Sequence, residues 1–142
     1  MTSLSFPDVN VWVALSWPGH MHHRKAWQWY ASQPATTSLV FCRVTQLGFL
    51  RLLTTAAVMG ADLLTNEQAY DSYAYWIRKD AAFMMDEPTT FENTFRTLSP
   101  RKQSMPKAWS DDYVQAFATE ARIPLVTFNQ ALAKRTPHSI LL

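Results

Sequence analysis

Residues 4–17 read LSFPDVNVWVALSW and predict the first unit of the fold. The apolar segment Leu4-Ser5-Phe6 is typical of a short strand, and it runs directly into Pro7-Asp8. From Val9 to Trp17, apolar residues recur at helical spacing until Pro18-Gly19 interrupts them. The stretch therefore predicts a strand, an acidic turn and a helix.

The same alternation of strands and helices continues along the chain. Further strands are expected at residues 37–41, 82–85 and 124–128, and further helices at residues 20–32, 44–53, 67–79, 91–98 and 109–122. Asn66 is expected to cap the helix at 67–79, and the basic stretch from Ser99 to Pro106 is expected to be an exposed loop. The pattern predicts an α/β fold with a parallel sheet flanked by helices on both faces.

Length and composition indicate one globular domain over residues 1–142, with 48% hydrophobic and 17% charged residues. The formal charge of +2 gives only modest attraction to a polyanion, so charge alone does not indicate a nucleic-acid partner. The single Cys42 is expected to be a small buried side chain, which excludes an internal disulfide and a cysteine-rich zinc site.

The N-terminal segment carries an acid and no basic leader, and no apolar run approaches the roughly 20 residues that span a bilayer. We therefore expect a cytoplasmic protein without a membrane segment. Six Trp residues exceed what a small core easily buries, which favours an interface, and a homodimer is plausible.

Polar side chains follow three of the expected strands, namely Asp8, Asp86 with Glu87, and Asn129. In open parallel sheets, ligands bind beyond the carboxyl ends of the strands. Mg²⁺ prefers carboxylate oxygens and water, so Asp8 could share an ion with Asp111 at the start of the helix at 109–122. Asp8 and Asp111 are equally suited to capping helices, and Asn129 to forming a turn.

Other chemistries fit the sequence less well. Three Gly residues in the whole chain leave no glycine-rich phosphate loop, and no Gly-x-Ser-x-Gly motif is present. His20, His22 and His23 are grouped, but a helix would bring only His20 and His23 to one face, and no Cys or further His lies nearby in the sequence. A zinc site is therefore disfavoured.

Four segments of the chain, taken in order, resemble one known family. They are Pro7-Asp8-Val9-Asn10-Val11-Trp12 with His20-Met21-His22-His23 and Ala26-Trp27, then CRVTQLGFLRL at 42–52, Trp109-Ser110-Asp111-Asp112-Tyr113, and Leu125-Val126-Thr127-Phe128-Asn129. Together they resemble the VapC-type PIN-domain toxins over essentially the whole chain. The resemblance implies a three-layer α/β/α domain with four or five parallel strands, RNA cleavage dependent on Mg²⁺ or Mn²⁺, and a small cognate antitoxin.

The resemblance also assigns roles to individual residues. Asp8 and Asp111, rather than Asp112, fall on acids of the family, whereas Gln46 and Asn129 stand where many relatives carry acids. Glu87 resembles an acid that some relatives have. The resulting hypothesis is that Asp8, Asp111 and Glu87 hold one or two metal ions, with Gln46 and Asn129 as neutral polar groups of a catalytic site that hydrolyses RNA phosphodiesters.

Basic residues are candidates for positioning the RNA backbone, or else belong to a solvated surface: Arg43, Arg101, Lys102 and Lys107. Two alternatives stay open. One is a PIN domain that binds RNA or an antitoxin without cleaving, its site weakened by Gln46 and Asn129. The other is an unrelated metal-dependent phosphoesterase or DNA nuclease.

Overall fold

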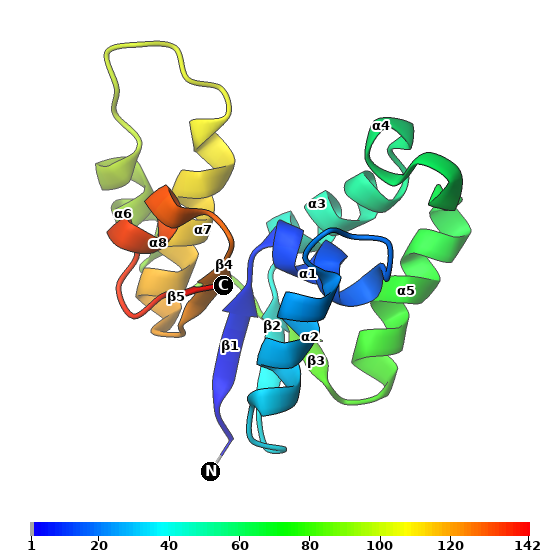
Figure 1. The fold of residues 1–142 in the computed structure, drawn as a ribbon. Coiled ribbons are helices and arrows are strands. Elements are labelled where there is room, and N and C mark those ends of the chain that lie inside the picture. The colour runs from blue at the N-terminus through cyan, green and yellow to red at the C-terminus, as the bar shows by residue number, and fades with distance from the viewer. Residues whose placement is uncertain (1) are drawn as a thin grey trace.

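In the computed structural model, which describes residues 2–142, five parallel strands form one sheet at the centre of an α/β fold (Figure 1). The strands are β1 (Leu4–Pro7), β2 (Ser38–Phe41), β3 (Ala82–Met84), β4 (Leu125–Thr127) and β5 (Ile140–Leu141). Their order across the sheet is β3-β2-β1-β4-β5. The chain therefore builds one side of the sheet from β1 to β3 and then crosses to the other side, so the topological switch lies between β1 and β4.

Helices cover both faces of the sheet, as the sequence predicts. One layer contains α1 (Val9–Ser16), α2 (His23–Ser32), α3 (Arg43–Leu53) and α5 (Asn66–Arg78), with α4 (Ala56–Met59) and the 3₁₀ helix η1 (Gly60–Asp62) at its end. The other layer contains α6 (Phe91–Leu98), α7 (Ala108–Ala121) and α8 (Gln130–Arg135), seen on the left in Figure 1. The three-layer α/β/α fold is confirmed.

Two hydrophobic clusters hold the layers against the sheet. Successive residues of a strand point to opposite faces. Accordingly, Leu39 and Phe41 of β2 belong to the cluster under α1, α2, α3 and α5, whereas Val40 belongs to the cluster under α6, α7 and α8. In the first cluster the rings of Trp12 and Phe41 stack with centroids 3.8 Å apart.

The positions of the Trp residues correct the prediction that the core is too small to bury them. Trp12, Trp29 and Trp76 are buried and Trp17 and Trp27 partly buried, so the core takes up most of the aromatic surface that we assigned to an interface. They fit because the indoles pack on one another and on neighbouring rings, as in the edge contact of Trp12 with Trp76. Trp109 is the exception, with 58% of its surface exposed.

The structure differs from the prediction mainly at short elements. It adds β5, α4, η1 and α8, which the sequence pattern did not predict. Asn66 is not the cap of α5: the Thr65 hydroxyl accepts from the Gln68 N–H while the Gln68 side chain accepts from the Thr65 N–H, and Asn66 becomes the first helical residue. Cys42 is buried, as expected.

Between residues 2 and 142, no helix taken singly has the length and apolar character needed to cross a membrane. One bent pair, Arg43–Leu53 with Ala56–Asp62, meets that requirement by length and composition only.

Candidate active site

Asp8 lies at the carboxyl end of β1, where the chain turns into α1. Its backbone N–H donates to the Val126 carbonyl of β4 over 2.9 Å, which ties this turn to the neighbouring strand. Its Oδ1 accepts from the Val9 N–H at 2.8 Å as the cap of α1, and its Oδ2 accepts from the Thr127 hydroxyl at 3.1 Å. Asp8 is therefore a helix cap, as one alternative proposed, and its carboxylate is held at the switch point of the sheet.

Asp111 reaches the same place from the opposite helix layer. It lies in the first turn of α7, and with Asp8 it lines a cavity of about 220 Å³. The other lining residues come from α1, α3 and α7: Val9, Val44, Leu47, Gly48, Arg51, Ser110 and Val114. Gly48 allows a close approach of α3 to α1, because a Cβ there would lie 2.8 Å from Val9 Cγ2.

The two carboxylates are electrostatically unfavourable neighbours. Burial raises the pKa of Asp8 and outweighs the hydrogen bonds from Val9 and Thr127, and the charge of Asp111 raises it further. Burial also raises the pKa of Asp111, against the opposing effect of Arg135, whose Nη2 lies 3.9 Å from the Asp111 Oδ2. A cation between Asp8 and Asp111 would offset both the desolvation and the repulsion.

The donor set fits a hard divalent ion that keeps most of its water. Mg²⁺ in phosphate-handling sites is commonly bound by one or two carboxylates plus water and phosphate oxygens. Asp8 and Asp111 can supply two carboxylates. No cluster of three or more His, Cys, Asp or Glu side chains suited to a metal occurs within residues 2–142.

Asp112, next to Asp111, has a different environment. It is 1% exposed and forms a bidentate pair with Arg101, whose Nη1 and Nη2 lie 2.5 and 2.9 Å from its two oxygens. Arg135 Nη1 lies 3.5 Å from its Oδ1. Asp112 therefore ties α7 to the loop before it and to α8. Of the two adjacent acids, Asp111 is the one that lines the cavity with Asp8.

Three further residues that the sequence suggested do not line the cavity shared by Asp8 and Asp111. The buried Gln46 side chain accepts from Arg43 Nη1 at 2.7 Å. The exposed Glu87 accepts from the Tyr113 hydroxyl at 2.6 Å, and Asn129 accepts from the Leu132 N–H at 3.1 Å as the cap of α8. Asn129 is linked to Asp8 through Thr127, since its N–H donates to the same Thr127 hydroxyl that binds Asp8.

Sequence reasoning missed two side chains that contact the carboxylates directly. Thr127 is fully buried, and it is the polar residue at the end of an otherwise apolar strand, a signal that the sequence did contain. Arg135 was missed because α8 was not predicted, although it carries the cation nearest to Asp111.

The fold and the site define a class: a PIN-type α/β/α domain with an acidic pocket where β1 and β4 end. No family model matches the chain. Over 131 residues it is 37% identical to ribonuclease VapC41 of Mycobacterium tuberculosis, an alignment that covers 89% of this chain and 90% of that protein. The chain therefore belongs to the VapC ribonuclease family.

Solved structures of this family share the fold. VapC20 of Mycobacterium tuberculosis, described as a Sarcin-Ricin loop cleaving toxin, matches with a TM-score of 0.65 at 16% identity, covering 92% of this chain and 93% of that chain. VapBC-1 from nontypeable Haemophilus influenzae matches with a TM-score of 0.63 at 12% identity, covering 98% and 96%. VapBC2 from Rickettsia felis, bound to a DNA fragment from their promoter, matches with a TM-score of 0.61 at 15% identity, covering 98% and 97%.

Proposed function

We propose that the protein is the toxin of a VapBC-type toxin–antitoxin pair and cleaves RNA phosphodiesters with the help of Mg²⁺ or Mn²⁺. Membership of the VapC ribonuclease family supports the reaction class. The observation that carries the metal assignment is the convergence of Asp8 and Asp111 on one cavity, with the pKa of each raised by burial.

In this proposal each residue of the site has a defined role. Asp8 and Asp111 hold the divalent ion directly or through water, and Val9 and Thr127 keep the Asp8 carboxylate oriented. When bound, the ion lowers the pKa of a water molecule and neutralises charge that develops on the phosphodiester. Arg135, beside Asp111 and with 37% of its side-chain surface exposed, is placed to contact the RNA backbone.

In the proposal, Gln46 and Asn129 are neutral polar residues near the metal site, and Glu87 is an acid outside the cavity of Asp8 and Asp111. Gln46 and Asn129 are neutral and already hydrogen-bonded, so they add no charge to the site. Fewer anionic ligands hold a hard cation less tightly. The same observation favours a second candidate, a domain that binds RNA or an antitoxin without cleaving.

The partners in the proposal are RNA, a small cognate antitoxin and a second copy of the chain, and the compartment is the cytoplasm. The antitoxin is supported by family membership and by the VapBC structures that share the fold. Co-expression with the neighbouring small open reading frame tests this partner: a stable complex that suppresses RNA cleavage supports it, and independent purification of the two proteins contradicts it.

The central test is cleavage of a structured RNA by the purified protein. Mg²⁺ or Mn²⁺ should support cleavage and EDTA should abolish it. Asp8→Asn and Asp111→Asn should each lower the rate at least about 100-fold, because each removes a proposed ligand. Asp71→Asn, the same substitution at an exposed position of α5, is the matched control and should cleave at the wild-type rate.

Other outcomes separate the alternatives. Cleavage without metal, or full activity in both site variants, contradicts the mechanism. Equal cleavage of DNA and RNA oligonucleotides in the same salt would indicate a nuclease without RNA preference. Growth inhibition that survives Asp8→Asn would indicate a binding protein.

A further inference from the structure

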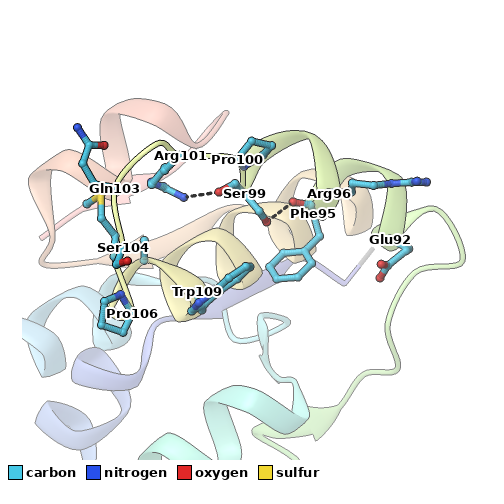
Figure 2. Close-up of a pocket in the computed structure, with 12 residues that line it drawn as sticks. Glu92, Phe95, Arg96, Ser99, Pro100, Arg101, Gln103, Ser104, Pro106 and Trp109 are labelled. Carbon is cyan, nitrogen blue, oxygen red and sulfur yellow. Dashed lines mark hydrogen bonds between the residues drawn. The ribbon is translucent and has the colours of Figure 1, made fainter.

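A second and larger cavity lies between α6 and α7, beneath the loop that joins them (Figure 2). Its volume is about 750 Å³, within the range of small-molecule sites. The aromatic rings of Phe95 and Trp109 and the side chains of Arg96 and Met105 contribute to its lining. It shares no residue with the cavity of Asp8 and Asp111.

The loop over this cavity is held in place by polar contacts. Arg101 is anchored on the buried Asp112 and also donates from Nη1 to the Ser99 carbonyl at 3.1 Å. The Ser99 hydroxyl donates to the Phe95 carbonyl at 2.5 Å. Figure 2 shows the loop arching from Ser99 to Pro106, with the contacts of Ser99 to Arg101 and to Phe95 at its α6 end. These contacts fix the α6 end of the loop that covers the cavity.

The chemistry of the cavity favours a ligand with a flat ring and negative charge. Trp109 is 58% exposed, and its ring centroid lies 6.1 Å from that of Phe95. Residues 93–107 contain two Arg, two Lys and no acid, and within residues 2–142 neither Lys102 nor Lys107 forms an ion pair. Glu92 is the acid among the lining residues. Exposed aromatic rings beside cationic groups are typical of single-stranded nucleic-acid sites.

The position of Trp109 links this cavity to the candidate active site. Trp109 and Asp111 lie in the first turn of the same helix, and Ser110 between them lines the cavity of Asp8 and Asp111. Two residues advance a helix by about 3 Å along its axis and rotate it by about 200°, so the side chains of Trp109 and Asp111 leave opposite sides of the first turn of α7. A base stacked on Trp109 would therefore belong to a nucleotide on the other side of this helix end from the phosphodiester at Asp111.

From these observations we propose that the Trp109 cavity binds an unpaired base of the RNA substrate, stacked on the indole, with Lys102 and Lys107 near the adjoining phosphates. This inference rests on the proposed ribonuclease function. A second copy of the chain is a poorer occupant, since a symmetric contact would bring the same basic loops face to face. The polyanionic backbone of RNA complements that charge.

The test is the affinity of the full chain for a short, fluorescently labelled single-stranded RNA, measured by anisotropy in EDTA so that no cleavage occurs. Trp109→Ala should weaken binding about tenfold, within the range measured for loss of one stacked base. Trp109→Phe should lose less RNA affinity, because a phenyl ring can still stack on a base. Tyr75→Ala, which removes a 54% exposed aromatic side chain on α5, should bind like the wild type.

An RNA of the same length with abasic sites tests the stacking itself. The wild type should bind it more weakly than the intact RNA, and the difference between wild type and Trp109→Ala should disappear. The comparison of intact with abasic RNA needs only the wild type, so it remains available if Trp109→Ala fails to fold. Circular dichroism shows whether that variant folds.

Three results would overturn the inference. The first is equal RNA affinity of wild type and Trp109→Ala, and the second is an equal loss of affinity for intact and abasic RNA when Trp109 is replaced by Ala. The third is that Trp109→Ala changes the mass of the protein in sedimentation but leaves its RNA affinity unchanged. The last would assign the cavity to a second copy of the chain. Binding that depends on Trp109 without any cleavage in Mg²⁺ or Mn²⁺ would remove the proposed function and keep the inference. Cleavage in Mg²⁺ or Mn²⁺ by a protein whose RNA binding does not depend on Trp109 would keep the proposed function and remove the inference.

Discussion

The Asp8 side chain caps α1. Burial and the charge of Asp111 make its carboxylate unfavourable to ionise. Its pKa in the folded protein lies above the ordinary value of an aspartate side chain. Between the unfolded and folded pKa values, the folded state binds the proton more tightly, so stability falls as pH rises through that window. Above the folded pKa, the ionised Asp8 therefore costs the metal-free protein stability.

Asp8→Asn should consequently stabilise the metal-free protein. Asn caps helices about as well as Asp, so the change removes the charge and keeps the cap. In EDTA at pH 7 the Tm should rise by a few degrees, which at this chain length corresponds to about 1 kcal/mol. The gain should shrink as pH falls through the raised pKa and vanish below the ordinary carboxyl range. Calorimetry across pH measures it, and equal melting temperatures at pH 7 would contradict the prediction.

Asp111 and Asp112 are adjacent in sequence, but we expect different effects on stability from neutralising them. Asp112→Asn breaks a buried pair with Arg101 and a contact with Arg135, and it should lower the free energy of unfolding by about 2 kcal/mol. Asp111→Asn removes a partly exposed charge and should leave stability nearly unchanged while cleavage is lost. Urea unfolding of both variants measures the difference, and a destabilised Asp111→Asn would count against this division of roles.

At the scale of elements, Asn129 is the link between β4 and α8. Its side chain caps α8 through the Leu132 N–H, and its own N–H binds Thr127, which also binds Asp8. Asn129→Ala should therefore cost about 1 kcal/mol through loss of the cap. Asn129→Asp should keep the cap and add a charge near Asp8, so we expect Mn²⁺ to bind several-fold more tightly. Calorimetric titration of both variants is the measurement, and equal Mn²⁺ affinity in wild type and Asn129→Asp would place Asn129 outside the metal site.

The elements that the sequence predicts are those with an apolar pattern long enough to repeat. The helix at 44–53 and the strand at 124–128 are found as α3 and β4, whereas β5 and α8 have two and six residues and carry too few apolar positions to show a period. Asp8, at the end of β1, lines one cavity with Asp111. Glu87 is not among the residues that line this cavity, and it accepts a hydrogen bond from Tyr113 that the sequence does not reveal.

At the scale of the whole molecule, the two helix layers have separate hydrophobic clusters and share one sheet. Leu39 and Val40 are neighbours in β2 but contribute to different clusters, as Val126 and Leu125 do in β4. Loss of either cluster would expose one face of the same strands. The candidate site also depends on both layers, because Asp8 leads into α1 and Asp111 belongs to α7.

We therefore predict that residues 1–142 unfold as one cooperative unit. Five of the six Trp side chains lie in or against the cluster under α1, α2, α3 and α5, so their fluorescence reports mainly on that layer, whereas far-UV circular dichroism reports on the helices of both. In urea the two signals should give the same midpoint and slope, since a two-state transition looks alike to every probe. Separate midpoints would mean that the layers unfold independently. In that case Asp8 and Asp111 would be held together less firmly than the shared sheet implies, because the two residues belong to different layers.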